Sequence, residues 1–350
     1  MTDRRSFIRK AGFAAALAAG GAGGLRAARS PGEKAAPSRI LPARLKRGDR
    51  VGLVTPGAPV TGEQLQATAK KLEQLRFRTT WNDTVLSQHG YFAGLDGERA
   101  GELMDMFTRE DIDAIWCVRG GYGSIRILDL LDYDVIRQHP KVLVGYSDIT
   151  AIHQAIFQET GLVTYHGPLG ISNFNRFTVK SLKQVIMDPE IPYGYPYRRE
   201  KGTRDNPEFD RYTIRGGRAE GLLAGGNISV LDSLIGTRFE TDFEGKIAYL
   251  EEVEEKTYRV DKMLFHLLSA TNLKNAAGIV LGTFSDCNIN DEPRLTLREA
   301  LYELLEPLGI PVSYGLPFGH IDRMVTIPNG IRARMDGDEN SLELLEATVT

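Results

Sequence analysis

The feature that most constrains the fold is an alternation of short apolar runs with helical patterns along residues 49–168. The segments 114–124, 141–148 and 162–168 each contain a short apolar run near their start and end in glycine, proline or polar residues. Between such runs, apolar side chains recur at helical spacing, as the leucines of 63–75 do. Apolar strands that alternate with helices predict an α/β fold with a parallel sheet covered on both faces. In such sheets, ligands bind at the carboxyl ends of the strands.

The second half of the chain has a different pattern. Residues 190–217 are rich in proline, glycine, tyrosine and charge, so we predict a linker there. Beyond it, a smaller α/β domain dominated by strands is indicated by apolar runs at 245–253 and 276–284, one clear amphipathic helix at 257–271 and a hairpin-like end at 330–346. The predicted organisation is a signal and linker at 1–38, an N-terminal α/β domain at 45–190 and a C-terminal domain at 215–350.

The first thirty residues have the order of a bacterial export signal. Arg4 and Arg5 open a charged segment, an Ala- and Gly-rich apolar stretch runs from Ala11 to Leu25, and small residues follow. The RRSFI core resembles a twin-arginine signal, which exports folded proteins. We therefore predict a periplasmic protein. The alternative interpretation is a basic disordered tail.

Composition and charge exclude several classes of protein. The chain is 42% hydrophobic and 25% charged, as soluble globular proteins are. Residues 1–30 hold six basic residues and one acidic residue, so the remainder has 37 basic and 45 acidic residues, a net charge of −8. This balance argues against a nucleic-acid partner. No apolar run reaches the roughly 18 residues of a membrane span.

The chain has only two cysteines, Cys117 and Cys287, far apart in the sequence. A disulfide framework is therefore excluded, and no Cys/His metal pattern is present. We expect two buried thiols, with a single bridge between them as the alternative. No cofactor is expected.

Ser147 lies where an apolar strand turns into a helix, in the sequence GYSDI. At such a turn the amide of Asp148 is placed to donate to an oxyanion, and the helix dipole adds to its effect. The sequence departs from the G-x-S-x-G elbow because Ile149 stands where the second glycine would be. The alternative interpretation is that Ser147 only caps the helix.

The glycine-rich segment RGGYGS, residues 119–124, follows the preceding strand. Adjacent glycines let the backbone approach a ligand closely, so Gly120 or Gly121 is a candidate for a second oxyanion donor. A tight turn is the alternative interpretation. A nucleotide site is disfavoured, because the first strand lacks G-x-G-x-x-G and the chain has no G-K-[ST].

A serine nucleophile requires a general base. Of the six histidines, His166 in TYHGP and His320 in GLPFGH lie at strand or turn ends, and the residues alone do not decide between them. The others fit the role less well: His89, His139, His153 and His266. The orienting carboxylate is best sought in the acidic run LEEVEE at 250–255, for which a solvated loop is the alternative.

Six motifs in order together resemble the LD-carboxypeptidases, a family that includes murein tetrapeptide carboxypeptidases and microcin C self-immunity peptidases. The motifs are RGGYGSIRIL, GYSDITAIH, TYHGP, EGLLAGGNISVLDSLIGT, LEEVEEKTYRVDKML and GLPFGH. The resemblance covers about residues 45–345. It implies a flavodoxin-like N-terminal domain, a smaller strand-rich C-terminal domain, a site in the cleft between them and a homodimer.

The resemblance also implies a serine peptidase with a Ser-Glu-His triad. Ser147 matches the nucleophile, Glu251 the orienting carboxylate and His320 the general base. The backbone amides of Asp148 and of Gly121 or Gly120 match the oxyanion hole.

The implied reaction is hydrolysis of the L,D amide bond that holds the terminal D-alanine of a murein tetrapeptide. A terminal carboxylate calls for a cation or free amides in the pocket. We assign Arg119 and Tyr122 to substrate binding, with Arg126 and Arg323 as other nearby cations. One alternative is an amide hydrolase of a peptide-nucleotide antibiotic or another acyl-amino acid conjugate. The other is a non-catalytic periplasmic ligand-binding module.

Overall fold

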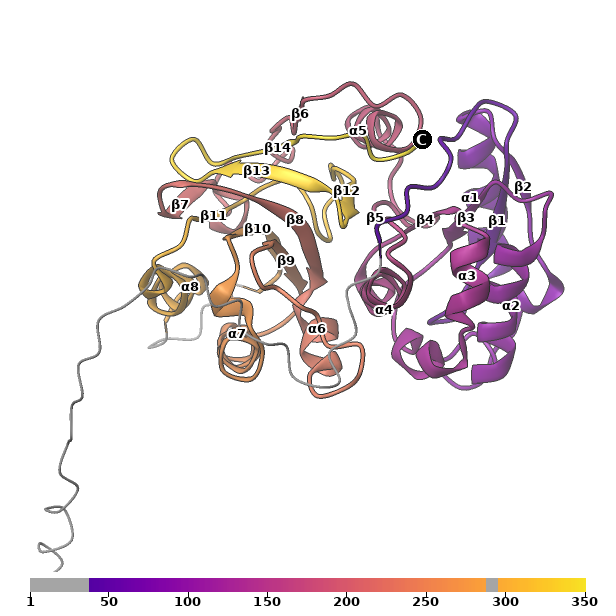
Figure 1. Ribbon diagram of the computed structural model, residues 1–350, viewed down its shortest axis with the longest axis horizontal. Coiled ribbons are helices and arrows are strands. Elements are labelled where there is room, and N and C mark those ends of the chain that lie inside the picture. Colours follow the sequence, from indigo (N-terminus) through magenta and orange to yellow (C-terminus); the bar gives the residue numbers. More distant parts are fainter. Residues whose placement is uncertain (1–37, 288–294) are drawn as a thin grey trace, which may run out of the picture. The chain divides into compact units, whose positions relative to one another are not determined.

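Figure 1 shows the computed structural model of the chain, which describes residues 38–287 and 295–350. The predicted export signal lies outside the described residues. Within residues 38–287 and 295–350, no helix combines the length and the hydropathy that a membrane span requires.

The first sheet is built from the apolar runs of the N-terminal half. Its parallel strands are β1 (Arg50–Val54), β2 (Arg78–Thr80), β3 (Ala114–Cys117), β4 (Val142–Gly145) and β5 (Thr164–His166). They lie in the order β2-β1-β3-β4-β5, which is the flavodoxin-like order. The predicted fold is confirmed, and the strand order reverses between β1 and β3. The loops that follow β1, β3 and β4 therefore meet at one edge.

The strands of the first sheet alternate with helices, as the sequence predicts. These helices are α1 (Gly62–Gln74), α2 (Asp96–Thr108), α3 (Tyr133–Gln138), α4 (Thr150–Thr160) and α5 (Arg176–Ile186), with a 3₁₀ helix η2 at Ser124–Leu130. A capping box between Thr61 and Gln64 begins α1. Helix α5 was not predicted, although the Asn175 side chain caps its first amides.

The second sheet occupies the C-terminal half and has a parallel centre with antiparallel edges. Its strands are β6 (Tyr193–Gly194), β7 (Tyr212–Arg215), β8 (Arg218–Asn227), β9 (Ile247–Val253), β10 (Gly278–Ser285), β11 (Val312–Tyr314), β13 (Arg332–Asp336) and β14 (Ser341–Leu344). Their order is β6-β14-β13-β8-β9-β10-β11-β7, in which β8 to β11 run parallel. The predicted hairpin is the β13–β14 pair.

Two predictions for the C-terminal half were wrong in part. Residues 190–217 are not only a linker, because they contain β6 and β7, the two edge strands of the second sheet. Edge strands are short and polar, so their composition resembles that of a loop. Besides the predicted helix α7 (Thr257–Ala270), the second sheet is accompanied by α6 (Ile228–Leu234) and α8 (Leu297–Leu305).

The two sheets are joined by a late segment of the chain. Strand β12 (Ile327–Asn329) pairs antiparallel with β5 and completes the first sheet. A single apolar cluster includes Trp116 and Tyr165 of the first sheet together with Tyr249 and Phe318 of the C-terminal half. Residues from both halves are therefore held against each other by a shared core. The predicted domain boundaries stay a prediction.

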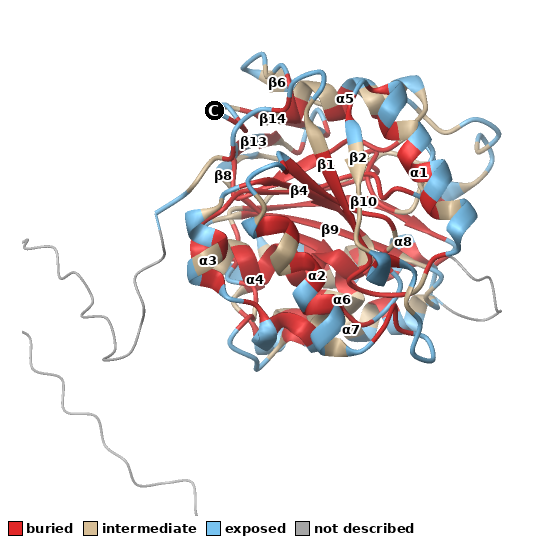
Figure 2. Ribbon diagram, turned by 90° about the vertical axis from the view of Figure 1, so that its right-hand side faces the viewer, coloured by how far each residue is buried: buried red, intermediate tan, exposed pale blue. Residues whose placement is uncertain are grey.

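Burial follows the layers of the fold. Figure 2 shows the central strands in red, whereas the outward faces of the helices are pale blue or tan. Cys117 and Cys287 are free and buried. Burial raises the pKa of the Cys287 thiol to about 12, so it stays protonated at neutral pH.

Candidate active site

Ser147 lies just beyond the end of β4, in a turn with unusual backbone geometry. Its φ angle is +65°, a left-handed conformation that costs a serine about 1–3 kcal/mol and persists only where the surrounding structure enforces it. The 3₁₀ helix η3 (Ser147–Ile149) begins with Tyr146 as its cap residue, and the Ser147 hydroxyl is hydrogen-bonded to His320 instead. The helix-cap interpretation of Ser147 is therefore wrong.

Glycines on both sides make room for this turn. A Cβ atom at Gly145 would lie 2.9 Å from the Ile149 side chain, and one at Gly120 would lie 3.2 Å from Cβ of Ser147. The carbonyl of Gly145 accepts hydrogen bonds from the His153 ring, at 2.8 Å, and from the amide of Gly167, at 3.0 Å. His153 thus holds the backbone that precedes Ser147.

The glycine-rich loop after β3 lies directly beside Ser147. A Cβ at Gly120 would be 3.3 Å from the amide nitrogen of Asp148, so the two predicted oxyanion segments are neighbours. The Gly120 carbonyl accepts from the amide of Ala58 at 2.9 Å. Because a trans peptide points its N–H away from its C=O, this bond directs the Gly121 N–H to the opposite side.

The Asp148 side chain has a role that sequence reasoning missed. Its carboxylate is buried and accepts a hydrogen bond from the amide of Ser124 at 2.9 Å. Burial raises the pKa of Asp148, while bonds from Ser124 and Gly123 oppose that shift. The carboxylate therefore connects the turn at Ser147 to the glycine-rich loop.

Glu251 comes from the parallel centre of the second sheet. It lies on β9 and is fully buried. The neighbouring Glu252 is also buried. Successive side chains of a strand point to opposite faces. Glu252 accepts hydrogen bonds from Asn227 and Ser229 near the start of α6, whereas Glu251 faces His320. The solvated-loop interpretation of this acidic run is therefore wrong for both residues.

His320 bridges the two halves of the site. Its Nδ1 is 2.8 Å from Oε2 of Glu251, and its Nε2 is 3.0 Å from Oγ of Ser147. Its own carbonyl accepts from the Ser285 hydroxyl at 2.9 Å, which anchors the loop to β10. The preceding Gly319 has a φ of +113°, and a Cβ there would lie 3.2 Å from the Glu251 carboxylate. Glycine is thus required for this close approach.

The electrostatics of the His320–Glu251 pair favour a charged imidazolium. Burial by itself lowers the pKa of His320, but the Glu251 carboxylate outweighs it and the pKa lies above the ordinary 6.5. Burial by itself raises the pKa of Glu251, but His320 outweighs it and the pKa lies below 4.5. Both shifts stabilise a proton on His320 next to an ionised Glu251.

A cleft of about 510 Å³ opens beside His320. The residues that line it come from α1, the turns after β4 and β5 and the His320 loop: Lys71, Tyr146, Ile171, Ser172, Asn173, His320, Ile321 and Asp322. The Tyr146 ring lies 4.8 Å from that of His320. Burial raises the pKa of Tyr146 to about 12, so its hydroxyl stays protonated.

Known proteins of one family match this chain over most of its length. Residues 51–167 match the LD-carboxypeptidase N-terminal domain, and residues 220–335 match the LD-carboxypeptidase C-terminal domain. A probable murein peptide carboxypeptidase of Bacillus subtilis is 36% identical over 88% of this chain and 95% of its own length.

The chain belongs to the LD-carboxypeptidase family. It is therefore a serine-type carboxypeptidase, and the alternative of a non-catalytic binding module is wrong. A murein tetrapeptide carboxypeptidase of Pseudomonas aeruginosa is 29% identical over 83% of this chain and 94% of its own. A solved structure of the microcin self-immunity protein MccF with glutamyl sulfamoyl guanosine has a TM-score of 0.80 and 25% identity, covering 89% of this chain and 99% of that one.

The cations that the sequence suggested for this LD-carboxypeptidase family member do not line the cleft beside His320. Arg119 donates to the carbonyl of Pro59 at 3.3 Å, Arg126 pairs with Asp96 at 2.8 Å, and Arg323 donates to the carbonyl of Arg199 at 2.7 Å.

Tyr122 does not line this cleft either. Its exposed ring lies 5.7 Å from that of Phe92 and 5.9 Å from that of Tyr91. The substrate-binding roles of Arg119 and Tyr122 stay predictions. Lys71, which does line the cleft, was missed because the sequence places it on an ordinary amphipathic helix.

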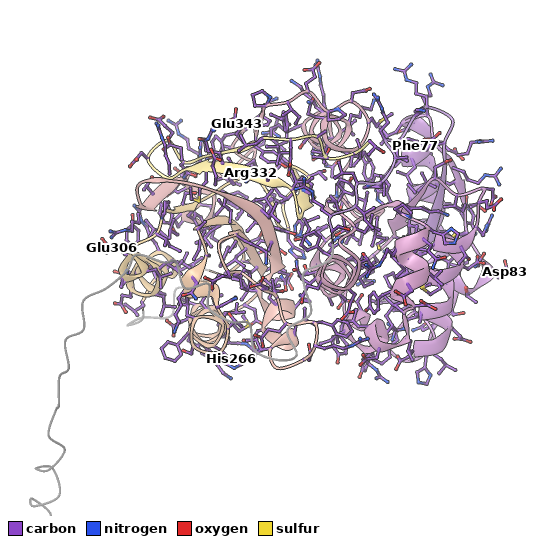
Figure 3. The ribbon with its side chains drawn as sticks, in the orientation of Figure 1. Phe77, Asp83, His266, Glu306, Arg332 and Glu343 are labelled. Carbon is purple, nitrogen blue, oxygen red and sulfur yellow. The ribbon has the colours of Figure 1, made fainter. Side chains whose placement is uncertain are left out.

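The remaining histidines lie in other settings. His166 is fully buried in β5, and burial lowers its pKa to about 4. His266 extends outward from α7 (Figure 3) and contacts Asp232 at 2.7 Å. No group of three or more His, Cys, Asp or Glu side chains within residues 38–287 and 295–350 is arranged to hold a metal ion.

Proposed function

We propose that this enzyme hydrolyses the L,D amide bond that releases the terminal D-alanine from murein tetrapeptides, with Ser147, His320 and Glu251 as its catalytic residues. The observation that carries the proposal is the chain of hydrogen bonds from Ser147 through His320 to Glu251, at 3.0 and 2.8 Å. These distances are within the range that proton transfer requires. The murein peptide carboxypeptidases among the relatives support the substrate class.

In the proposed reaction, Oγ of Ser147 attacks the carbonyl carbon of the penultimate residue while Nε2 of His320 takes the hydroxyl proton. The tetrahedral oxyanion accepts hydrogen bonds from the amides of Asp148 and Gly121 (or Gly120). Such preorganised donors commonly supply a large part of the rate enhancement of acyl transfer. The intermediate collapses as His320 gives the proton to the leaving amine of D-alanine. Water then attacks the acyl-enzyme, His320 takes its proton, and Ser147 is regenerated.

Glu251 holds His320 in the tautomer that this reaction needs. In the neutral ring, Nδ1–H donates to the carboxylate, so Nε2 presents its lone pair to Ser147. When His320 becomes an imidazolium, the buried carboxylate stabilises the positive charge. Full burial of Glu251 strengthens this interaction relative to water.

We further propose that the enzyme is exported through its twin-arginine signal and acts in the periplasm as a homodimer. The support for export is the charged, apolar and small-residue order of residues 1–30. Cell fractionation of the wild type and an Arg4→Lys/Arg5→Lys double variant tests export, since loss of the arginine pair should retain the protein in the cytoplasm. Equal periplasmic amounts of the two proteins would overturn this assignment.

A second candidate substrate class is a peptide-nucleotide conjugate. The structural similarity to MccF, solved with glutamyl sulfamoyl guanosine, favours this alternative. The same three side chains would then cleave a different amide bond.

The test is mass spectrometry of disaccharide tetrapeptide and of an aminoacyl sulfamoyl nucleoside, each incubated with the wild type and with Ser147→Ala. Loss of one alanine from the tetrapeptide by the wild type alone supports the first function. Cleavage of the nucleoside conjugate alone supports the second. Turnover of the tetrapeptide by both proteins would remove Ser147 from the mechanism.

A further inference from the structure

Lys71 places an ammonium group in the cleft that also exposes His320. It lies in the last turn of α1, and its Nζ donates to the carbonyls of Gly170 at 3.0 Å and Ser172 at 2.8 Å. The ammonium also lies 5.7 Å from the centre of the Phe174 ring. A long, flexible side chain is thereby held in one position before any ligand binds.

The charge of Lys71 is not neutralised by a neighbouring acid. No ion pair joins it to an acidic side chain of residues 38–287 and 295–350. Partial burial lowers the pKa of Lys71 from the ordinary 10.5. An ammonium has three N–H donors, of which the two carbonyls engage two. One donor and an uncompensated positive charge are left for a ligand.

The charges that line the cleft favour an anion beside Lys71 and disfavour one beside Asp322. Asp322, the acidic residue that lines the cleft, is exposed and repels a carboxylate from its own side. Three arginines near the sequence motifs do not line this cleft, because their guanidinium groups contact other residues. They are Arg119, Arg126 and Arg323. Among the described residues that line this cleft, Lys71 is therefore the cationic side chain beside the imidazole.

We propose that Lys71 binds the terminal carboxylate of the substrate and so restricts hydrolysis to the last peptide bond. This inference rests on the proposed carboxypeptidase function and assigns its specificity. In a peptide that ends one residue beyond the scissile carbonyl, the carboxylate lies a few bonds from the reacting carbon. A fixed cation in the same cleft as His320 attracts this negative charge and so strengthens the binding of a substrate that carries it. A longer peptide presents a neutral amide at that place.

The experiment compares two substrates and three proteins. The substrates are a murein tetrapeptide with a free terminal carboxylate and its C-terminal carboxamide. The proteins are the wild type, Lys71→Met and Lys70→Met, the last being a matched control because Lys70 is the exposed neighbour on α1. We expect the wild type and Lys70→Met to prefer the free acid by about 10- to 100-fold in kcat/KM, the effect of one hydrogen bond to a charged group. Lys71→Met should lose this preference.

Each outcome decides between the inference and its alternatives. An unchanged preference in Lys71→Met overturns the inference and leaves the proposed function intact. Equal losses on both substrates show that Lys71 only anchors the loop at 170–172, and this also overturns it. If the wild type cleaves neither substrate, the proposed carboxypeptidase function itself is overturned. Two further variants, Lys71→Gln and Lys71→Arg, keep the test decisive if Lys71→Met does not fold, and thermal unfolding checks that each is folded. Lys71→Gln should lose the preference for the free acid. Lys71→Arg should keep it, because only arginine retains the positive charge.

Discussion

His166 and His320 are alike in sequence and opposite in structure. Each follows an apolar or aromatic run, and each precedes or follows a glycine-containing turn. In the fold, His320 contacts Glu251 and Ser147, whereas neither ring nitrogen of His166 has a hydrogen-bond partner among the described residues. The ring of His166 instead packs 5.6 Å from Tyr249, 5.7 Å from Tyr146 and 6.2 Å from Phe318.

The two histidines differ in the groups that lie beside the ring. Burial lowers the pKa of His166 to about 4, so this ring stays neutral at physiological pH. The Glu251 carboxylate overrides the same effect at His320 and raises its pKa. An adjacent carboxylate and an accessible hydroxyl, rather than burial or the local sequence, distinguish the two.

Replacing His320 should produce the largest effect. His320→Gln removes the proton acceptor of Ser147, so we expect kcat to fall by about 10⁴-fold or more. Hydrolysis of tetrapeptide, followed by release of alanine, measures the change, and circular dichroism checks the fold. A residual rate within tenfold of the wild type would contradict the assignment of His320, because another group would then be the base.

Replacing Glu251 should produce the next largest effect. Glu251→Gln keeps the size of the side chain but removes the charge that holds the imidazolium, so a loss of about 10²- to 10⁴-fold in kcat is expected. The matched control is Glu254→Gln, an acid of the same run. Similar losses in both variants would mean that the general acidity of this region, rather than the contact at 2.8 Å, supports His320.

The pH dependence of kcat/KM should report the raised pKa of His320. In the proposed mechanism Nε2 of His320 must be neutral, so kcat/KM should fall as the pH drops through the raised pKa of His320, which lies above 6.5. Glu251→Gln removes the main cause of that rise and should move the acidic limb to lower pH. This limb reports an apparent pKa of the coupled pair. An unmoved limb in the variant would assign the titration to another group.

Replacing His166 should produce the smallest effect. His166→Phe puts an apolar ring among aromatic neighbours and removes two ring nitrogens that lack described partners. We expect kcat to stay within about threefold and the free energy of unfolding to change by less than about 1.5 kcal/mol, the usual cost of an apolar repacking. Chemical denaturation and the tetrapeptide assay measure both quantities. A loss comparable to that of His320→Gln would show that His166 acts on the Glu251 side of the site.

The first sheet was predictable from the sequence because its strands are buried on both faces. Short apolar runs such as 142–145 are best explained as buried strands when helical patterns separate them. The edges of the second sheet were not predictable, since β6 and β7 have the composition of loops. Lys71 was not predictable for a related reason: its partners, Gly170 and Ser172, are backbone carbonyls about a hundred residues away. Every residue has a backbone carbonyl, so the sequence contains no acidic residue that would mark the partner of Lys71.

The amino-acid sequence was sufficient for the α/β class, for the strand-to-helix turn at Ser147 and, through the resemblance of six ordered motifs, for the enzyme family and the match of Glu251 to the orienting carboxylate. Those properties depend on local patterns, on residue types and on their order along the chain. The three-dimensional arrangement was needed to show that Glu252 binds Asn227 instead of His320, that His166 is enclosed by aromatic rings and that Lys71 lines the same cleft as the imidazole. Each of these contacts joins segments far apart in the chain, and their geometry depends on how the two sheets pack through a common core.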